Sequence, residues 1–207
     1  MKGLIIKDIL NLRKNYKITI AIMGIFATYA YGTGNPSYMI AMVTLTLAMM
    51  PITSMAYDEM AKWDRYALAM PISRKDIVLS KYILSILLSI VSILVSFIIS
   101  YIIILPRSNM ERKELLIVTY VIFAISLVFV SVIFPFIYKF GVEKSRIISI
   151  AVVAVPTMLG YVLYEMGLQL PIKNQLFFVL RISPLILFLI IFCSASLSYR
   201  IYKNKDI

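Results

Sequence analysis

The sequence of 207 residues contains no histidine and a single cysteine, Cys193. Without histidine, it lacks the commonest metal ligand and the side chain best suited to acid–base catalysis at neutral pH. Cys193 has no second cysteine with which to pair, and we interpret it as a small packing residue. The chain also lacks the GxxxxGK[ST] motif of a phosphate-binding loop. We therefore expect no catalytic residues, no metal and no nucleotide site in this chain.

Charged side chains are few and are missing from long stretches of the sequence. Hydrophobic residues make up 61% of the chain, and its mean hydropathy is +0.92. A soluble domain has only about 45–50% apolar residues. A helix needs about 20 residues to cross about 30 Å of hydrocarbon, so we expect these stretches to lie in lipid. The uncharged runs cover residues 18–57, 82–106, 115–138, 147–164 and 182–199.

The first uncharged run is long enough for two crossings. Residues 32–37 in its middle, GTGNPS, combine glycines with a proline suited to the first turn of a new helix. We therefore predict an all-α membrane protein whose six transmembrane helices form one domain, residues 1–207. The continuous Ile, Leu and Val runs lack the alternation of a membrane β-barrel. The predicted crossings are residues 17–33, 37–57, 80–105, 115–138, 146–165 and 178–199.

The basic residues predict the orientation of these crossings. With six crossings both termini lie on the same side, and 16 of the 21 lysines and arginines fall on that side. The positive-inside rule therefore puts both termini in the cytoplasm of a multi-pass plasma-membrane protein. This topology accounts for the net charge of +11, and no aromatic–basic motif accompanies it, so we expect no nucleic-acid partner.

Residues 1–15 have an amphipathic pattern. Ile5, Ile9 and Leu12 fall on one helical face, and Lys7 and Lys14 fall on another. Such a helix is too polar to span a bilayer and is typical of the membrane interface. We predict an interfacial elbow helix that leads into the first crossing. The alternative is a polar cytoplasmic extension of that crossing.

The loop at residues 57–79 mixes acids, bases, a proline and the only tryptophan. Residues 58–69 are predicted to form a short helix that ends before Pro71. Ser73, with Asp76 three residues later, is expected to cap the helix that follows. Apolar residues among charges of both signs are typical of a docking surface. The alternative is an ordinary solvated loop that Trp63 anchors at the headgroups.

Three stretches in and beside this loop follow a pattern found in a known family: Asp58-Glu59, residues 68–78 (LAMPISRKDIV) and Ser80-Lys81-Tyr82. In these residues the loop resembles that of the membrane subunits of type-2 ABC exporters. It resembles especially the small six-helix permeases related to the phenol-soluble-modulin exporters of Gram-positive bacteria, and the match is specific in this loop. Outside the loop it rests on helix count, the amphipathic start and chain size. The sequence departs from the family at Ala69-Met70, where Leu or Ser often precedes the proline.

The resemblance implies that the loop carries a coupling helix, which sits in a cleft of a separate ATPase subunit. It also implies that this ATPase binds ATP and Mg, and that a second permease copy, identical or a close paralogue, completes a dimer. The substrate would pass at the interface between permeases. The residues implied in ATPase coupling are Asp58, Glu59, Trp63, Leu68, Met70, Pro71, Ser73, Arg74, Lys75 and Asp76.

Five serines recur at helical spacing along the third predicted crossing. Small polar residues in one stripe allow close approach of helices and interhelical hydrogen bonds. The stripe indicates either helix packing or a weakly polar lining of a translocation path, which Thr46 and Thr53 would extend. The five residues are Ser85, Ser89, Ser92, Ser96 and Ser100.

These observations favour the permease subunit of an ATP-driven exporter. No charged residue lies deep in a predicted crossing, which argues against coupling to an ion gradient. An apolar interior with Ser, Thr and Tyr suits an amphipathic or hydrophobic substrate, such as a peptide toxin or antimicrobial peptide. The alternative is a non-transporting membrane scaffold or assembly factor. An intramembrane enzyme ranks last, because no catalytic constellation is found.

Overall fold

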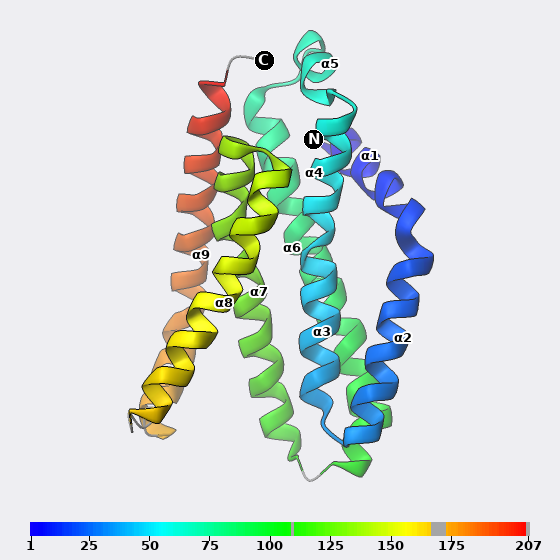
Figure 1. Ribbon diagram of the computed structural model, residues 1–207, viewed down its shortest axis with the longest axis vertical. Helices are drawn as coiled ribbons and strands as arrows, with labels where there is room; N and C mark the ends of the chain where they lie inside the picture. The colour runs from blue at the N-terminus through cyan, green and yellow to red at the C-terminus, as the bar shows by residue number, and fades with distance from the viewer. Residues whose placement is uncertain (109, 167–172, 206–207) are drawn as a thin grey trace. The chain divides into compact units, whose positions relative to one another are not determined.

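The computed structural model describes residues 1–108, 110–166 and 173–205. Within these ranges every regular element is helical (Figure 1). The chain divides into two compact units, residues 1–130 and the residues from Ser131 onward. The elements are α1 (Lys2–Leu12), η1 (Arg13–Asn15), α2 (Tyr16–Thr33), α3 (Pro36–Ala48), α4 (Met50–Met60), α5 (Trp63–Ala69), α6 (Arg74–Ile99), η2 (Ser100–Ile104), η3 (Leu105–Arg107), α7 (Arg112–Phe140), α8 (Val142–Glu165) and α9 (Lys173–Lys203).

Five helical segments of the described chain are long and apolar enough to cross a membrane. They confirm an all-α, multi-pass membrane protein. The first predicted crossing forms a helix, α2, which is not among the five. Its 18 residues span about 27 Å at 1.5 Å per residue, and its lysine, threonines, tyrosines and glycines dilute its apolar content. Six crossings therefore stay a prediction. The five segments are Pro36–Met60, Arg74–Ile104, Arg112–Phe140, Val142–Val162 and Leu180–Lys203.

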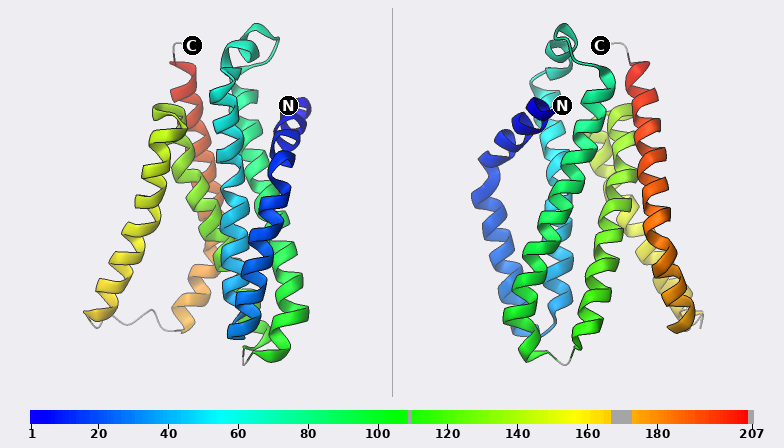
Figure 2. Two further views of the ribbon diagram at one scale, coloured as in Figure 1. Left: turned by 45° about the vertical axis from the view of Figure 1, so that its right-hand side comes forward. Right: turned by 180° about the vertical axis from the view of Figure 1, so that it is seen from behind.

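The turn predicted at residues 32–37 joins α2 to α3. Gly34 adopts a left-handed conformation with φ of 66°, which a residue without a Cβ tolerates. The Asn35 side chain accepts a hydrogen bond of 3.0 Å from the Ser37 N–H, and Pro36 opens α3. The chain therefore reverses, and α2 and α3 lie side by side while α3 also packs on α6 (Figures 1 and 2).

The second predicted crossing consists of two consecutive helices. α3 ends at Ala48, and α4 begins at Met50 with Pro51 in its first turn. Because a proline cannot donate the backbone hydrogen bond of a helix interior, it favours a new start here. α4 then continues through Asp58 to Met60, so the prediction of one short helix over residues 58–69 is wrong at its beginning.

A left-handed residue separates α4 from the short helix α5. Lys62 has φ of 50°, a conformation that ends a right-handed helix. α5 therefore covers only Trp63–Ala69, and the chain is extended at Met70 before Pro71. The Ser73 hydroxyl then accepts a hydrogen bond of 3.1 Å from the Asp76 N–H, which confirms the predicted cap of α6.

The predicted helix at the N-terminus is α1, which packs against α4 and α6. Its buried face consists of Leu4, Asp8 and Leu12. Ile9 was expected on the same face as Leu12, but it is 49% exposed. The side of α1 that packs on the other helices is therefore centred on the buried Asp8, and the interfacial role of α1 stays a prediction.

The second unit begins within α7 and contains α8 and α9. Gly141, with φ of 84°, makes the turn between α7 and α8. The Ser194 hydroxyl of α9 donates a hydrogen bond to the Ser131 carbonyl of α7. The buried rings of Tyr138 and Tyr202 meet edge to face at a centroid distance of 5.5 Å, which fixes these two helices against each other.

Candidate functional site

The segment that joins α4 to α6 carries exposed apolar side chains. Met60 at the end of α4 is 80% exposed, Tyr66 in α5 is 63% exposed, and Met70 after α5 is 44% exposed. Ala67 of α5 is instead fully buried, so this short helix has a fixed inner face. α5 lies at the end of the unit, beyond the helices that flank it (Figure 1). The three exposed residues, Met60, Tyr66 and Met70, form what we call the loop knob.

The structure brings the predicted coupling residues to this end of the first unit. Asp58 and Glu59 lie in the last turn of α4, and Trp63 opens α5. Pro71 and Ser73 are exposed between α5 and α6, whereas the side chain of Leu68 lies outside the described residues. The first turn of α6 holds Arg74, Lys75 and Asp76. The predicted coupling role of these residues stays a prediction.

Asp58 points into the protein and binds two lysines. Its Oδ1 accepts a hydrogen bond of 2.6 Å from the Lys7 ammonium of α1. Its Oδ2 accepts another of 2.6 Å from the Lys81 ammonium of α6. Asp58 therefore ties the end of α4 to both α1 and α6.

Asp8 is the second acid of this cluster and is fully buried. Its Oδ1 accepts hydrogen bonds from Lys81 Nζ at 2.8 Å and from the Ser54 hydroxyl at 2.9 Å. Lys7 Nζ lies 3.2 Å from the same oxygen. Two carboxylates thus face two ammonium groups, which balances the charge, as burial of ions requires. We call Lys7, Asp8, Asp58 and Lys81 the ionic cluster.

The ionic cluster reaches α5 through Trp63. The Lys7 ammonium lies 4.3 Å from the centroid of the Trp63 ring, a cation–π contact. Beside it, a hollow of about 480 Å³ opens between α1, α4 and the start of α5. Its lining includes Lys14, Tyr57 and Met60. Met60 of the loop knob is part of this lining, so an exposed apolar side chain lies at the edge of the hollow.

The serine stripe is buried along the whole of α6 and into η2. Ser85, Ser92 and Ser96 donate hydrogen bonds to carbonyls of their own helix. Ser100 donates to the Pro36 carbonyl of α3 at 3.5 Å, so this end of the stripe faces α3. Ser89 is fully buried, and its hydroxyl has no hydrogen-bond partner among the described residues. This burial is what close packing of α6 requires, and the lining of a path stays a prediction.

The two threonines assigned with the stripe lie apart from its buried core. Thr46 of α3 is half-buried and donates a hydrogen bond of 2.7 Å to the Met42 carbonyl. Thr53 of α4 is also half-buried. Their predicted role in a path likewise stays a prediction.

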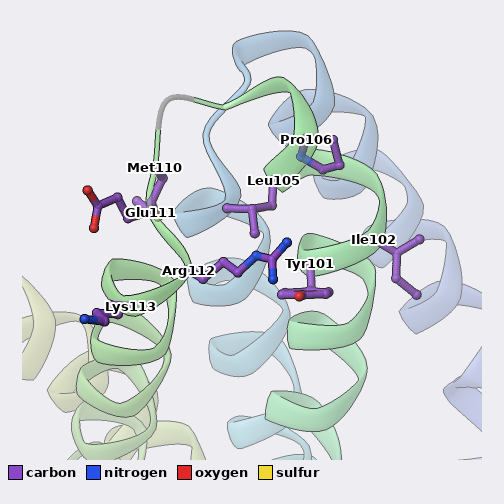
Figure 3. Close-up of a pocket in the computed structure, with 8 residues that line it drawn as sticks. All are labelled: Tyr101, Ile102, Leu105, Pro106, Met110, Glu111, Arg112 and Lys113. Carbon is purple, nitrogen blue, oxygen red and sulfur yellow. The ribbon is translucent and has the colours of Figure 1, made fainter.

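A groove of about 760 Å³ lies at the opposite end of α6 from the loop (Figure 3). The Arg112 guanidinium points toward the Tyr101 ring, 5.7 Å from its centroid. Leu105 and Pro106 supply apolar surface beside them. The groove holds none of the predicted site residues, so we place the candidate site at the loop.

Sequence reasoning missed the partners of Asp58. Lys81, which binds Asp58, was expected only to open the third crossing. Asp8, the second acid that binds Lys81, was given no role. The signal was present in the spacing of Leu4, Asp8 and Leu12, which puts an acid between two apolar residues on one helical face. An acid in that position needs a buried cation, and Lys81 supplies it.

The fold and the distribution of charge define an all-α, multi-pass membrane protein with a braced loop at one end. Residues 3–203 match the family model described as ABC-2 family transporter protein. The chain therefore belongs to this family, and it is a membrane permease component of an ABC transporter. The family supplies the membrane part and not the ATPase, so an ATPase partner is implied. The chain matches none of the curated proteins compared with it.

Proposed function

We propose that the chain is the permease subunit of an exporter and that the loop knob docks into a cytoplasmic ABC ATPase. The observation that carries the proposal is the exposure of Met60, Tyr66 and Met70 on the segment that joins α4 to α6. Exposed apolar anchors surrounded by charges are typical of a protein interface. The ATPase would bind ATP and Mg, which this chain has no motif to bind.

The position of α5 suggests how ATP hydrolysis would act on the membrane helices. α5 connects directly to α4 on one side and to α6 on the other through the capped start at Ser73. Movement of the ATPase against the loop knob would therefore displace two membrane helices together. In this proposal α2 is a sixth crossing, α1 lies at the interface, both termini are cytoplasmic, and the chain works as a dimer.

The proposed substrate is amphipathic or hydrophobic, such as a peptide toxin or antimicrobial peptide, and it moves out of the cell. Support comes from α6, which carries no charged residue from Tyr82 to its end at Ile99. The buried polar groups of that stretch include the hydroxyls of the serine stripe. Such an interior offers hydrogen bonds but no site for an ion. The resemblance of the loop to permeases of peptide exporters points in the same direction.

The test is co-purification with an ABC ATPase from the same genome, co-expressed with this chain. Met60→Asp with Met70→Asp places two charges on the loop knob at positions exposed enough to leave the fold intact. Met110→Asp with Met166→Asp makes the same changes on predicted outer loops and serves as the control. We expect the ATPase to co-purify with the wild type and the control, and to be lost from the loop variant.

Two outcomes would contradict the proposal. If the ATPase binds the loop variant as well as the wild type, the docking surface lies elsewhere. If no ATPase binds any of the three proteins, the chain acts as a membrane scaffold instead. Size-exclusion profiles of each variant show whether a loss of binding reflects the surface or the fold.

A further inference from the structure

The ionic cluster joins three helices that are far apart in the sequence. Asp8 comes from α1, Asp58 from α4 and Lys81 from α6, and Ser54 of α4 adds a hydroxyl. The side chains of Asp8 and Lys81 are only 1% and 6% exposed. Ions buried this deeply are costly unless each is paired, so this arrangement holds its helices in one relative position.

The contacts of the cluster form a continuous path from α1 to α5. Lys81 bridges Asp8 and Asp58 at 2.8 and 2.6 Å. Asp58 also binds Lys7 at 2.6 Å, and Lys7 lies on the Trp63 ring. A movement of α5 therefore either carries Lys7 of α1 with it or breaks the cation–π contact between Lys7 and Trp63.

The opposite face of α1 is apolar and exposed. Ile6 is 56% exposed, Ile9 is 49% exposed and Leu10 is 56% exposed. Such a face suits the boundary between headgroups and acyl chains. α1 thus has one face for the bilayer surface and one that is ionically tied to the helices around the loop.

We propose that Asp8 and Lys81 are positioning residues that make α1 a moving part of the coupling between ATPase and permease. This inference rests on the proposed function, because it assumes that the ATPase acts on the loop knob. The cluster transmits displacement of α5 to α1, so that α1 shifts along the bilayer surface when nucleotide binds to the ATPase. Neither residue contacts substrate or ATP in this role.

The test replaces the ion pair by apolar side chains. In Asp8→Leu with Lys81→Met, Asp58 and Lys7 remain as a balanced pair, so the site keeps no uncompensated charge. Asp8→Asn, which keeps the shape of the side chain, is the second variant in case the double variant does not fold. Glu111→Leu with Lys113→Met removes the same two charges from exposed positions at the other end of α6.

Each complex with the ATPase is reconstituted in nanodiscs, and two quantities are measured. The first is hydrogen exchange of residues 2–12 with and without a non-hydrolysable ATP analogue and Mg²⁺. The second is the ATP hydrolysis rate relative to that of the isolated ATPase. In the wild type and the control we expect nucleotide to change exchange in α1. In the double variant we expect ATPase binding to persist and the nucleotide-dependent change in exchange to disappear. We also expect the stimulation of hydrolysis to decrease by a factor of about 2 to about 30.

If the ion pair had only a structural role, the folded double variant would behave like the wild type in both measurements. Nucleotide-dependent exchange in α1 of the double variant at the wild-type level would therefore overturn the inference. So would a wild-type α1 that does not respond to nucleotide while the ATPase is bound. If the wild type binds no ATPase at all, the proposed function fails and this inference fails with it.

Discussion

Replacing Lys81 by methionine tests whether the ionic cluster is buried as described. Methionine keeps much of the apolar stem of lysine and removes the ammonium group. Two carboxylates, those of Asp8 and Asp58, then depend on Lys7 alone. Because the Asp8 side chain is only 1% exposed, water cannot compensate it, and the folded state loses stability.

The magnitude follows from the cost of breaking a buried ion pair, about 3–5 kcal/mol. In a chain of this size 1 kcal/mol corresponds to about 2–4 °C. We therefore expect Lys81→Met to lower Tm by about 6–20 °C. Adding Asp8→Leu to Lys81→Met should recover most of that loss, because an apolar replacement of the whole pair is about neutral or stabilising. The two single variants should thus be strongly non-additive.

The assay is thermal unfolding in detergent, followed by the fluorescence of Trp63, the only tryptophan. This ring lies on the Lys7 ammonium and reports on the cluster directly. Lys113→Met, at an exposed position, is the control and should shift Tm by less than about 2 °C, since exposed charges contribute little. A Lys81→Met variant as stable as that control would refute the buried cluster.

Two further predictions concern α6 and the loop. Ser96→Leu should destabilise the protein by about 1–3 kcal/mol, because Ser96 is fully buried and overpacking costs that much. Ser89→Ala should be neutral or stabilising by about 1 kcal/mol, because it removes a buried hydroxyl without a partner among the described residues. Lys62→Gly should stabilise the protein by about 1 kcal/mol, since Lys62 has φ of 50°, whereas Lys75→Gly within α6 should destabilise it by about 1 kcal/mol. Thermal unfolding measures the stability of all four variants. A Ser96→Leu variant more stable than Ser89→Ala would contradict the buried serine stripe, and a Lys75→Gly variant more stable than Lys62→Gly would contradict the left-handed conformation of Lys62.

Much of the local structure could be predicted from the sequence. The turn at residues 32–37 and the cap at Ser73 are confirmed, because each depends on a few neighbouring side chains and the backbone they favour. The shared burial of the serine stripe also follows from spacing alone, since residues three or four apart lie on one face of a helix. Long uncharged runs became long helices for the same local reason.

The boundaries inside the loop were harder to predict. The acids at Asp58 and Glu59 look like the beginning of a loop helix, yet α4 continues through them to Met60. Asp58 remains helical because its carboxylate is neutralised by lysines of α1 and α6. No pattern of neighbouring residues contains that information.

Composition by itself determined that this chain is an all-α membrane protein, because the transfer of an apolar helix into lipid depends on the residues of that helix alone. Only the tertiary structure decided that Asp8 and Lys81 are buried partners. Their attraction exists only once α1, α4 and α6 have come together, and water has been excluded from between them. The sequence specifies the charges, but the packing of distant helices decides which of them meet.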